Sequence, residues 1–120
     1  IIVICSTLAS AVPWEAASKD AYWLAHHEAL LTQTKKIQST QISAVFLGGS
    51  ITQGWVANNG RPVWHEHYEP RRSFNYGIGG DRTEHVLWRI EHGEFDGVKP
   101  KVVVLMIGEL TLIDLDFDNL

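Results

Sequence analysis

The sequence has only one cysteine, Cys5, and it has no internal repeat or low-complexity tract. A single thiol forms no disulfide within the chain, so disulfides cannot supply the stability of the fold. Apolar residues make up 45% of the 120 positions, which is ordinary for a globular protein. The chain therefore suits one small domain that depends on its apolar core.

Basic residues are also few. Ten Lys and Arg stand against fourteen Asp and Glu, which gives a net charge of -4 at pH 7. Nucleic-acid-binding domains carry clustered Lys and Arg, so we expect no nucleic-acid partner. The two basic pairs, Lys35-Lys36 and Arg71-Arg72, are interpreted as solvated surface.

The apolar N-terminal stretch 1–12 is too short to span a bilayer, which takes about 20 residues. It lacks an initiator Met and a basic beginning, but its composition is typical of the core of a secretory signal. Ala9-Ser10-Ala11 fits the small-x-small rule of a cleavage site. We therefore predict a signal-peptide remnant at 1–11, a secreted or extracytoplasmic protein, and removal of Cys5 on cleavage. A buried edge strand is the alternative interpretation.

The first half of the chain alternates between helical and strand patterns. Residues recur at a spacing near 3.6 between Ser18 and Lys36, which predicts an amphipathic helix. The residues expected on its buried face are Trp23, Leu24, His27, Leu30, Leu31 and Thr34. This helix ends on two lysines, which favour the negative end of the helix dipole. The later segments are predicted as a strand over 43–47, a helix or turn over 51–55, a loop over 57–62 and a short helix over 63–68.

The second half repeats the alternation. A short strand is predicted over 73–76, and a helix begins after it with Asp81 as N-cap and Glu84 completing a capping box. Val86, Leu87 and Ile90 form the apolar stripe of this helix, and Gly93 is its expected C′ residue. The run 102–107 is rich in β-branched residues, which indicates a strand buried on both faces of a parallel sheet. The order of elements predicts a βαβ architecture with right-handed crossovers.

Ser50 is the best candidate nucleophile. It follows Gly48 and Gly49, which end a predicted buried strand, and open α/β sheets bind their ligands at the carboxyl ends of strands. A turn serine that caps the next helix is an equal alternative on these three residues alone. A nucleotide site is disfavoured, because 77–82 carries Arg82 where a dinucleotide motif needs its last glycine and the chain has no P-loop Lys-Ser/Thr pair.

The block Gly48-Gly49-Ser50-Ile51-Thr52 resembles the Gly-Asp-Ser-Ile-Thr block of the SGNH or GDSL hydrolases, with Gly49 in place of Asp. The stretches 74–90, 93–94 and 99–104 resemble one branch of that family, the proteins similar to the catalytic subunits of intracellular platelet-activating-factor acetylhydrolase type Ib. The likeness runs from about Trp23 to Gly108. It covers three family blocks in order.

The resemblance implies a flavodoxin-like three-layer α/β/α sandwich with a parallel sheet, here truncated after the third strand. It implies a serine esterase that hydrolyses short acyl (acetyl) esters of lipid or carbohydrate through an acyl-serine intermediate. Ser50 would be the nucleophile, and the N–H groups of Ser50 and Gly80 would form the oxyanion hole. The substrate would be a small-molecule ester, with no metal or organic cofactor. Because family members often pair, a homodimer is also expected.

The C-terminal part departs from the family pattern. A Gly-x-Asn-Asn block is expected at 108–111, but Leu110 stands where an oxyanion-hole Asn would be, and such a loss costs roughly 10²–10³ in rate. The family's Asp-x-x-His block has no counterpart before Leu120. We therefore interpret 12–120 as the N-terminal part of a hydrolase domain with an atypical tail at 109–120, and expect marginal stability. A catalytically inactive hydrolase-like fragment that serves as a binding or structural module is the alternative function.

Other histidines could in principle replace the missing base. His85 is the nearest to Gly80 in sequence, but it belongs to the predicted helix after the turn, where a structural role is expected. The pair His65-x-His67 lacks further ligands at a matching spacing, so no metal site is predicted.

Overall fold

A computed structural model of the chain describes residues 12–108. The predicted signal remnant at 1–11 and the atypical tail at 109–120, which includes Leu110, lie outside the described residues. None of the helices in the described part is both long and apolar enough to cross a membrane.

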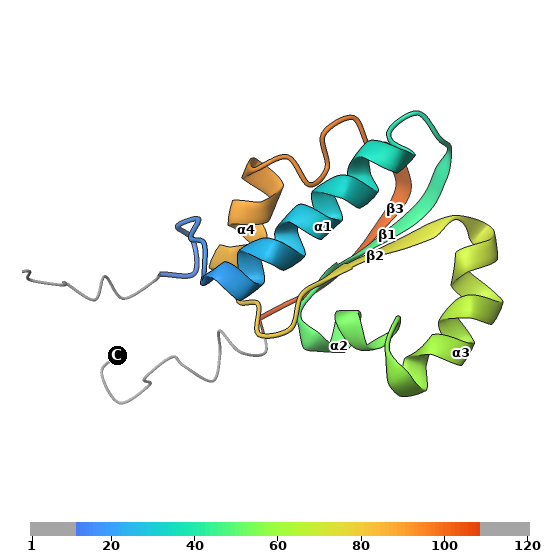
Figure 1. Ribbon diagram of the computed structural model, residues 1–120, viewed down its shortest axis with the longest axis horizontal. Coiled ribbons are helices and arrows are strands. Elements are labelled where there is room, and N and C mark those ends of the chain that lie inside the picture. The colour runs from blue at the N-terminus through green and yellow to red at the C-terminus, as the bar shows by residue number, and fades with distance from the viewer. Residues whose placement is uncertain (1–11, 109–120) are drawn as a thin grey trace, which may run out of the picture.

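A parallel sheet of three strands in the order β2-β1-β3 forms the centre of the fold. The strands are β1 (Ile42–Gly48), β2 (Ser73–Gly77) and β3 (Pro100–Met106). Helices cover both faces: α1 (Ala21–Ile37) and α4 (Thr83–Glu91) lie on one side, and α2 (Ser50–Gly54) and α3 (Arg61–Val63) on the other (Figure 1). The predicted three-layer α/β architecture with a parallel sheet is confirmed.

The segment between α2 and β2 is more helical than its sequence suggests. The predicted loop over 57–62 contains a 3-10 turn at Asn58–Gly60, and α3 already begins at Arg61. The chain continues through a π-helical turn at Trp64–Tyr68 and a 3-10 turn at Glu69–Arg71. The Gly60-Arg61-Pro62 run is typical of a loop, but a proline in the first helical turn loses no hydrogen bond. The loop prediction is therefore wrong in its second half.

Helix α1 forms where its periodicity predicts. The Asp20 side chain accepts a hydrogen bond from the Trp23 N–H at 2.9 Å, which caps its N-terminus. Its buried face consists of Trp23, His27, Thr34 and Ile37. Leu24, which was expected on this face, is exposed. Polar residues take part in the buried face because they find partners across the interface, as described below for His27.

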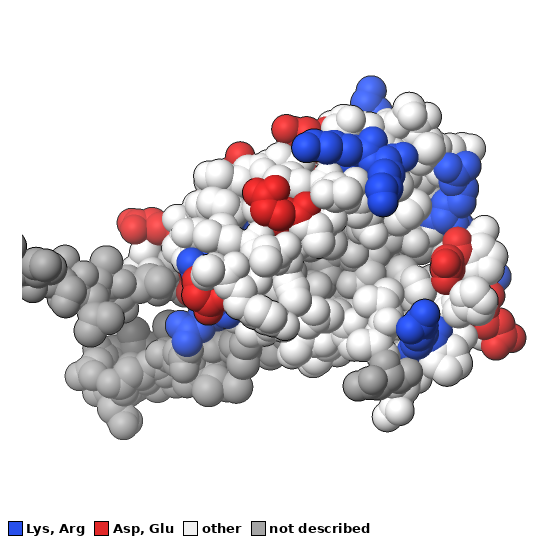
Figure 2. Space-filling view, viewed as in Figure 1, with Lys and Arg blue, Asp and Glu red and all other residues white. Residues whose placement is uncertain are grey.

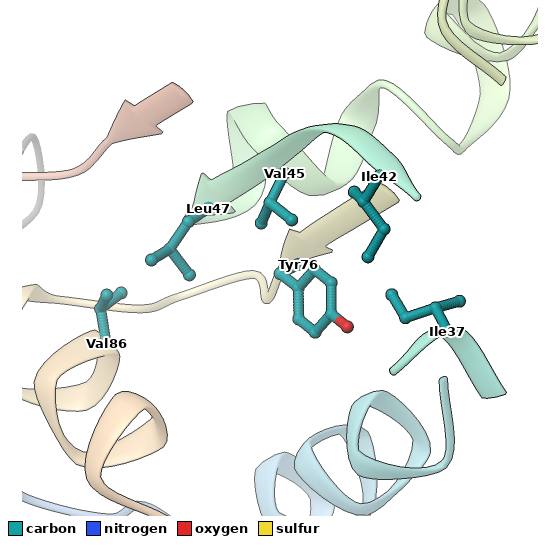
Figure 3. Close-up of a cluster of buried hydrophobic side chains, with 6 residues drawn as sticks. All are labelled: Ile37, Ile42, Val45, Leu47, Tyr76 and Val86. Carbon is teal, nitrogen blue, oxygen red and sulfur yellow. The ribbon is translucent and has the colours of Figure 1, made fainter. Parts of the chain in front are cut away.

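The main core lies between the sheet and the α1–α4 layer. Its buried side chains come from strands β1 and β2 and from both covering helices (Figure 3). They are Ile37, Ile42, Val45, Leu47, Tyr76 and Val86. The Tyr76 hydroxyl and the Thr34 hydroxyl are 2.8 Å apart, so the one polar atom of this cluster is paired.

The opposite face of the sheet packs on aromatic rings. The ring centroid of Phe46 on β1 lies 5.1 Å from that of Trp64 and 5.1 Å from that of Tyr68, both edge-on. This geometry is the favoured one for aromatic pairs. Phe46 thus joins the helical segment after α3 to the sheet.

The outer edge of β2 is partly closed. The Gln33 side chain on α1 donates a hydrogen bond to the backbone oxygen of Asn75 at 3.2 Å. Figure 1 shows β2 in front of β1, between α1 and the α2–α3 segment. An edge carbonyl is thereby occupied by a side chain of the same chain.

The start of α4 differs from the predicted capping box. The N-cap is Arg82, and its N–H donates to Nδ1 of His85 at 2.9 Å. Asp81 and Glu84, the residues assigned to the box, are both buried. The Asp-x-x-Glu pattern is a local signal, and for Asp81 the more distant partners Trp23 and Arg89 override it. Ile90, expected on the apolar stripe, is 45% exposed, whereas Gly93 has the positive φ of 91° expected after a helix end.

Strand β3 forms as predicted, but its residues 102–106 are 40–58% exposed. The prediction of burial on both faces is therefore wrong for the described part of the chain. The physical reason is position: β3 is an edge strand, paired only with β1, and too little of residues 12–108 packs on it to bury its side chains. This exposed apolar edge agrees with the expected marginal stability, which stays a prediction.

Candidate active site

Ser50 is the first residue of α2, directly beyond the carboxyl end of β1 and one glycine. Its side chain is exposed, and within residues 12–108 its hydroxyl makes no hydrogen bond. The N-cap of α2 is Gly49, which has no side chain to cap the helix. The alternative of a capping serine is therefore not supported, and the hydroxyl stays available at the carboxyl edge of the sheet.

The turn that follows β2, residues 78–81, is called the glycine turn and lies beside Ser50. A Cβ atom built on Gly79 would be 3.9 Å from the Cβ of Ser50 and 2.9 Å from Oε1 of Gln53. The real contact is a hydrogen bond of 2.9 Å from the Gly79 N–H to that Gln53 oxygen. Because Gln53 lies one helical turn after Ser50, this bond holds the glycine turn against the first turn of α2.

The backbone N–H groups of this turn are almost all occupied. The Ile78 N–H donates to the Gly48 oxygen at 3.1 Å, and the Asp81 N–H donates to the Ile78 oxygen at 3.2 Å, closing the turn. Gly80 between them has a φ of 77°, a conformation that favours glycine. Within the described residues the Gly80 N–H makes no hydrogen bond. The Ser50 N–H likewise has no acceptor inside its helix, as expected at the first helical position.

Asn75 on β2 connects α2 to the end of β2 through two hydrogen bonds of its side chain. Its side-chain amide donates to the Thr52 oxygen at 2.6 Å, and its side-chain oxygen accepts from the Gly77 N–H at 2.8 Å. Both groups are buried, so α2 is fastened to the end of β2. Sequence reasoning missed this residue; a polar side chain at a buried strand position directly before a glycine turn was the available signal.

Gly77 shows how closely α2 approaches β2. A Cβ atom there would fall on the backbone nitrogen of Gln53, whereas one on Gly54 would meet nothing within 4 Å. We predict that Gly77→Ala destabilises the protein by about 1–3 kcal/mol, the usual cost of overpacking. Gly54→Ala is the matched control and should change stability by less than about 1 kcal/mol. Urea unfolding of both variants measures this, and equal stability of the two would contradict the close approach.

A buried guanidinium joins the ends of the strands to the helices. Arg89 on α4 is fully buried and donates to the Tyr76 oxygen at 3.0 Å and to the Gly48 oxygen at 3.5 Å. Gly48 is the last residue of β1 and directly precedes the serine loop, residues 49–50. Tyr76 lies at the end of β2, just before the glycine turn. Arg89 therefore fixes the two strand ends that carry the site.

Two buried carboxylates compensate the charge of Arg89. Its guanidinium is 2.9 Å from Asp81 and 2.6 Å from Glu94. Asp81 also accepts from the indole N–H of Trp23 at 2.5 Å, and Glu94 lies 2.8 Å from Nδ1 of His27. Burial raises the pKa of both carboxyl groups, and the charge of Arg89 opposes that rise. Sequence analysis did not predict these ion pairs. The available signal was a charged residue, Arg89, three residues after Val86 and therefore on the same face of the predicted helix.

We predict that Arg89→Met destabilises the protein by about 3–5 kcal/mol, because it leaves two buried carboxylates without their cation. Arg61→Met is the control, since Arg61 is exposed and forms no ion pair within residues 12–108. Arg89→Lys keeps the charge and should retain more stability than Arg89→Met. Chemical unfolding is the measurement. An Arg89→Met protein as stable as the Arg61→Met control would contradict the role of the network.

His85 makes no hydrogen bond to Ser50 among the described residues. It is buried on α4, and its Nδ1 accepts the Arg82 N–H. Burial lowers the pKa of His85 to about 4, with the nearby Glu84 carboxylate opposing that effect. The expectation of a structural role agrees with this placement. His65 and His67 are exposed, His65 pairs with Glu69 at 2.8 Å, and no group of three metal-ligating side chains occurs among the described residues.

The lowered pKa of His85 predicts a pH dependence of stability. Between pH 6.5 and pH 4 the unfolded chain binds a proton at this residue and the folded chain does not, so stability falls as the pH falls through that window. The loss due to His85 is at most about 3 kcal/mol, at 1.36 kcal/mol per unit of pKa difference. His85→Gln should flatten this part of the stability–pH curve, while the exposed His67→Gln should not. Thermal melts between pH 7 and pH 4 test it, and parallel curves for both variants would contradict it.

Two cavities adjoin the glycine turn. The smaller, about 240 Å³, lies between the start of α1 and the turn, and its walls include Lys19, Trp23, Gln53 and Gly79. The larger, about 570 Å³, runs along the β2 edge, and the two share the wall residues His26, Gln53 and Ile78. Figure 2 shows few charged side chains over the centre of this face. Neither cavity has Ser50 or Gly80 among its wall residues, so both lie beside the candidate site and not at it.

The fold and the site define a class: a parallel α/β protein with a serine and an open glycine turn at the carboxyl edge of its sheet. The family model of the GDSL-like lipases and acylhydrolases matches residues 46–108, from the middle of β1 to just beyond β3. The chain belongs to this family.

The chain is 34% identical over 96 residues to the platelet-activating factor acetylhydrolase IB subunit alpha1 of Rattus norvegicus and of Homo sapiens. The match covers 80% of this chain and 39% of each relative. The alpha2 subunit of Homo sapiens is 35% identical over 89 residues, which cover 74% of this chain and 36% of the relative. The chain therefore spans about two fifths of the length of the curated relatives it matches.

Proposed function

We propose that the protein is a serine esterase that hydrolyses short acyl esters, acetyl esters above all, of a lipid or carbohydrate alcohol. Membership of the GDSL-like acylhydrolase family establishes the coarser class of hydrolase. The finer proposal is supported by one observation: an exposed serine hydroxyl lies next to a turn whose Gly80 N–H has no partner in the described part of the chain.

The reaction would proceed in two steps. The Ser50 oxygen attacks the ester carbonyl carbon, the carbonyl oxygen becomes an oxyanion, and the N–H groups of Ser50 and Gly80 stabilise it. The C–O bond to the alcohol then breaks, the alcohol leaves with a proton, and an acyl-serine forms. Water attacks the acyl-serine, releases the carboxylic acid and restores the hydroxyl. None of the histidines among residues 12–108 forms a hydrogen bond with Ser50.

Labelling of the native full-length protein with a fluorophosphonate probe tests the nucleophile. The wild type should label, and Ser50→Ala should lose both labelling and hydrolysis of 4-nitrophenyl acetate by at least about 10³-fold, because loss of a catalytic serine removes most of the turnover. Ser39→Ala, a change of an exposed serine in the turn after α1, is the control and should label as the wild type. Labelling that is absent in the wild type would favour the alternative of an inactive binding or structural module.

Secretion and pairing into a homodimer are further parts of this proposal. Secretion depends on the composition of 1–11, and pairing on the resemblance to a family whose members often pair. The intact mass and N-terminal sequence of the native protein would test the first, and its mass in solution the second.

A further inference from the structure

Lys19 reaches from the segment before α1 to the glycine turn. Its Nζ donates a hydrogen bond of 2.9 Å to the backbone oxygen of Gly80, 61 residues later in the chain. A Cβ atom built on Gly80 would be 3.0 Å from the same nitrogen, so the ammonium lies directly against this residue. Lys19 also lines the 240 Å³ cavity that Gly79 and Gln53 border.

The contact holds a part of the turn that no other described contact holds. Gly79 is held through its N–H by Gln53, and Asp81 through its N–H by Ile78. The Gly80 carbonyl is held only by Lys19 among the described residues. Gly80 has its positive φ of 77°, so the direction of its free N–H depends on how the peptide units on both sides are fixed.

The positive charge of Lys19 is not neutralised by a direct ion pair among the described residues. Lys19 is half-buried and forms no ion pair within residues 12–108. Two acids lie near it: Asp20, which caps α1 and lines the same cavity, and Asp81, whose carboxyl group feels the charge of Lys19 and pairs with Arg89. An ammonium has three donors, and the Gly80 oxygen takes one of them. A positive charge therefore stands beside the amide that would face the oxyanion.

We propose that Lys19 is a positioning residue for the esterase reaction: its ammonium holds Gly80 so that the Gly80 N–H faces the oxyanion, and adds positive potential there. The inference rests on the proposed function. Donors that are fixed before the reaction stabilise the developing charge without reorganisation. A misdirected donor loses this effect even when the substrate still binds.

Three substitutions separate the hydrogen bond from the charge. Lys19→Met removes both, Lys19→Gln keeps a donor without charge, and Lys19→Arg keeps both. Lys36→Met is the control, because Lys36 is exposed in the last turn of α1. We expect kcat for 4-nitrophenyl acetate to fall about tenfold or more in Lys19→Met, with KM changed by less than about twofold, since a misplacement near the chemistry costs up to about 10²-fold. Lys19→Gln should be intermediate, and Lys19→Arg should recover most of kcat.

Amide hydrogen exchange of the same variants gives a second readout that needs no activity. Lys19→Met should speed exchange at Gly79 and Asp81 by about tenfold while core amides stay protected, because the turn opens locally. Lys36→Met should leave both amides as in the wild type. Unchanged exchange and an unchanged kcat in Lys19→Met would overturn the inference.

The outcomes also separate this inference from the proposed function. Activity that persists in Ser50→Ala overturns the proposed function and with it the catalytic part of the Lys19 proposal, while exchange still decides whether Lys19 holds the turn. Activity that depends on Ser50 but not on Lys19 overturns the Lys19 proposal alone. A loss of kcat in Lys19→Met that Lys19→Arg does not recover would also overturn it.

Discussion

The buried guanidinium of Arg89 is the interaction on which the remaining structure depends. It joins Asp81, Glu94 and the two strand ends, and through these carboxylates it reaches Trp23 and His27 on α1. A buried charge without its partners costs several kcal/mol, so the elements that supply the partners must assemble together. Helices α1 and α4 and the carboxyl ends of β1 and β2 are thereby placed relative to one another. The serine loop and the glycine turn follow from that placement.

Most elements of the fold could be predicted from the sequence, because their signals are local. The periodicity of α1, the apolar run of β1 and the glycine after α4 lie within a few residues of the structure they cause. Asp81 was misassigned for the opposite reason. Its partner Trp23 lies 58 residues away, and no local pattern reveals such a pair. The exposure of β3 was likewise not predictable, since burial depends on what else packs against a strand.

The candidate site divides in the same way. Ser50 and Gly80 were named from a serine after a strand and from the resemblance of two blocks to a hydrolase family, and the structure brings their two loops together. Gln53, Asn75 and Lys19 were missed. Each acts on the backbone of a distant segment, and each is an ordinary polar residue in its own surroundings. Sequence motifs thus reveal the residues that would face a substrate. They do not reveal the residues that hold those residues in place.

The hydrogen bond from Gln33 to β2 makes the two edges of the sheet different. On that side an edge carbonyl is already taken by a side chain of α1. On the other side, β3 offers an exposed apolar strand that pairs only with β1 among the described residues. A further strand, from this chain or from another molecule, would therefore add beside β3 and not beside β2.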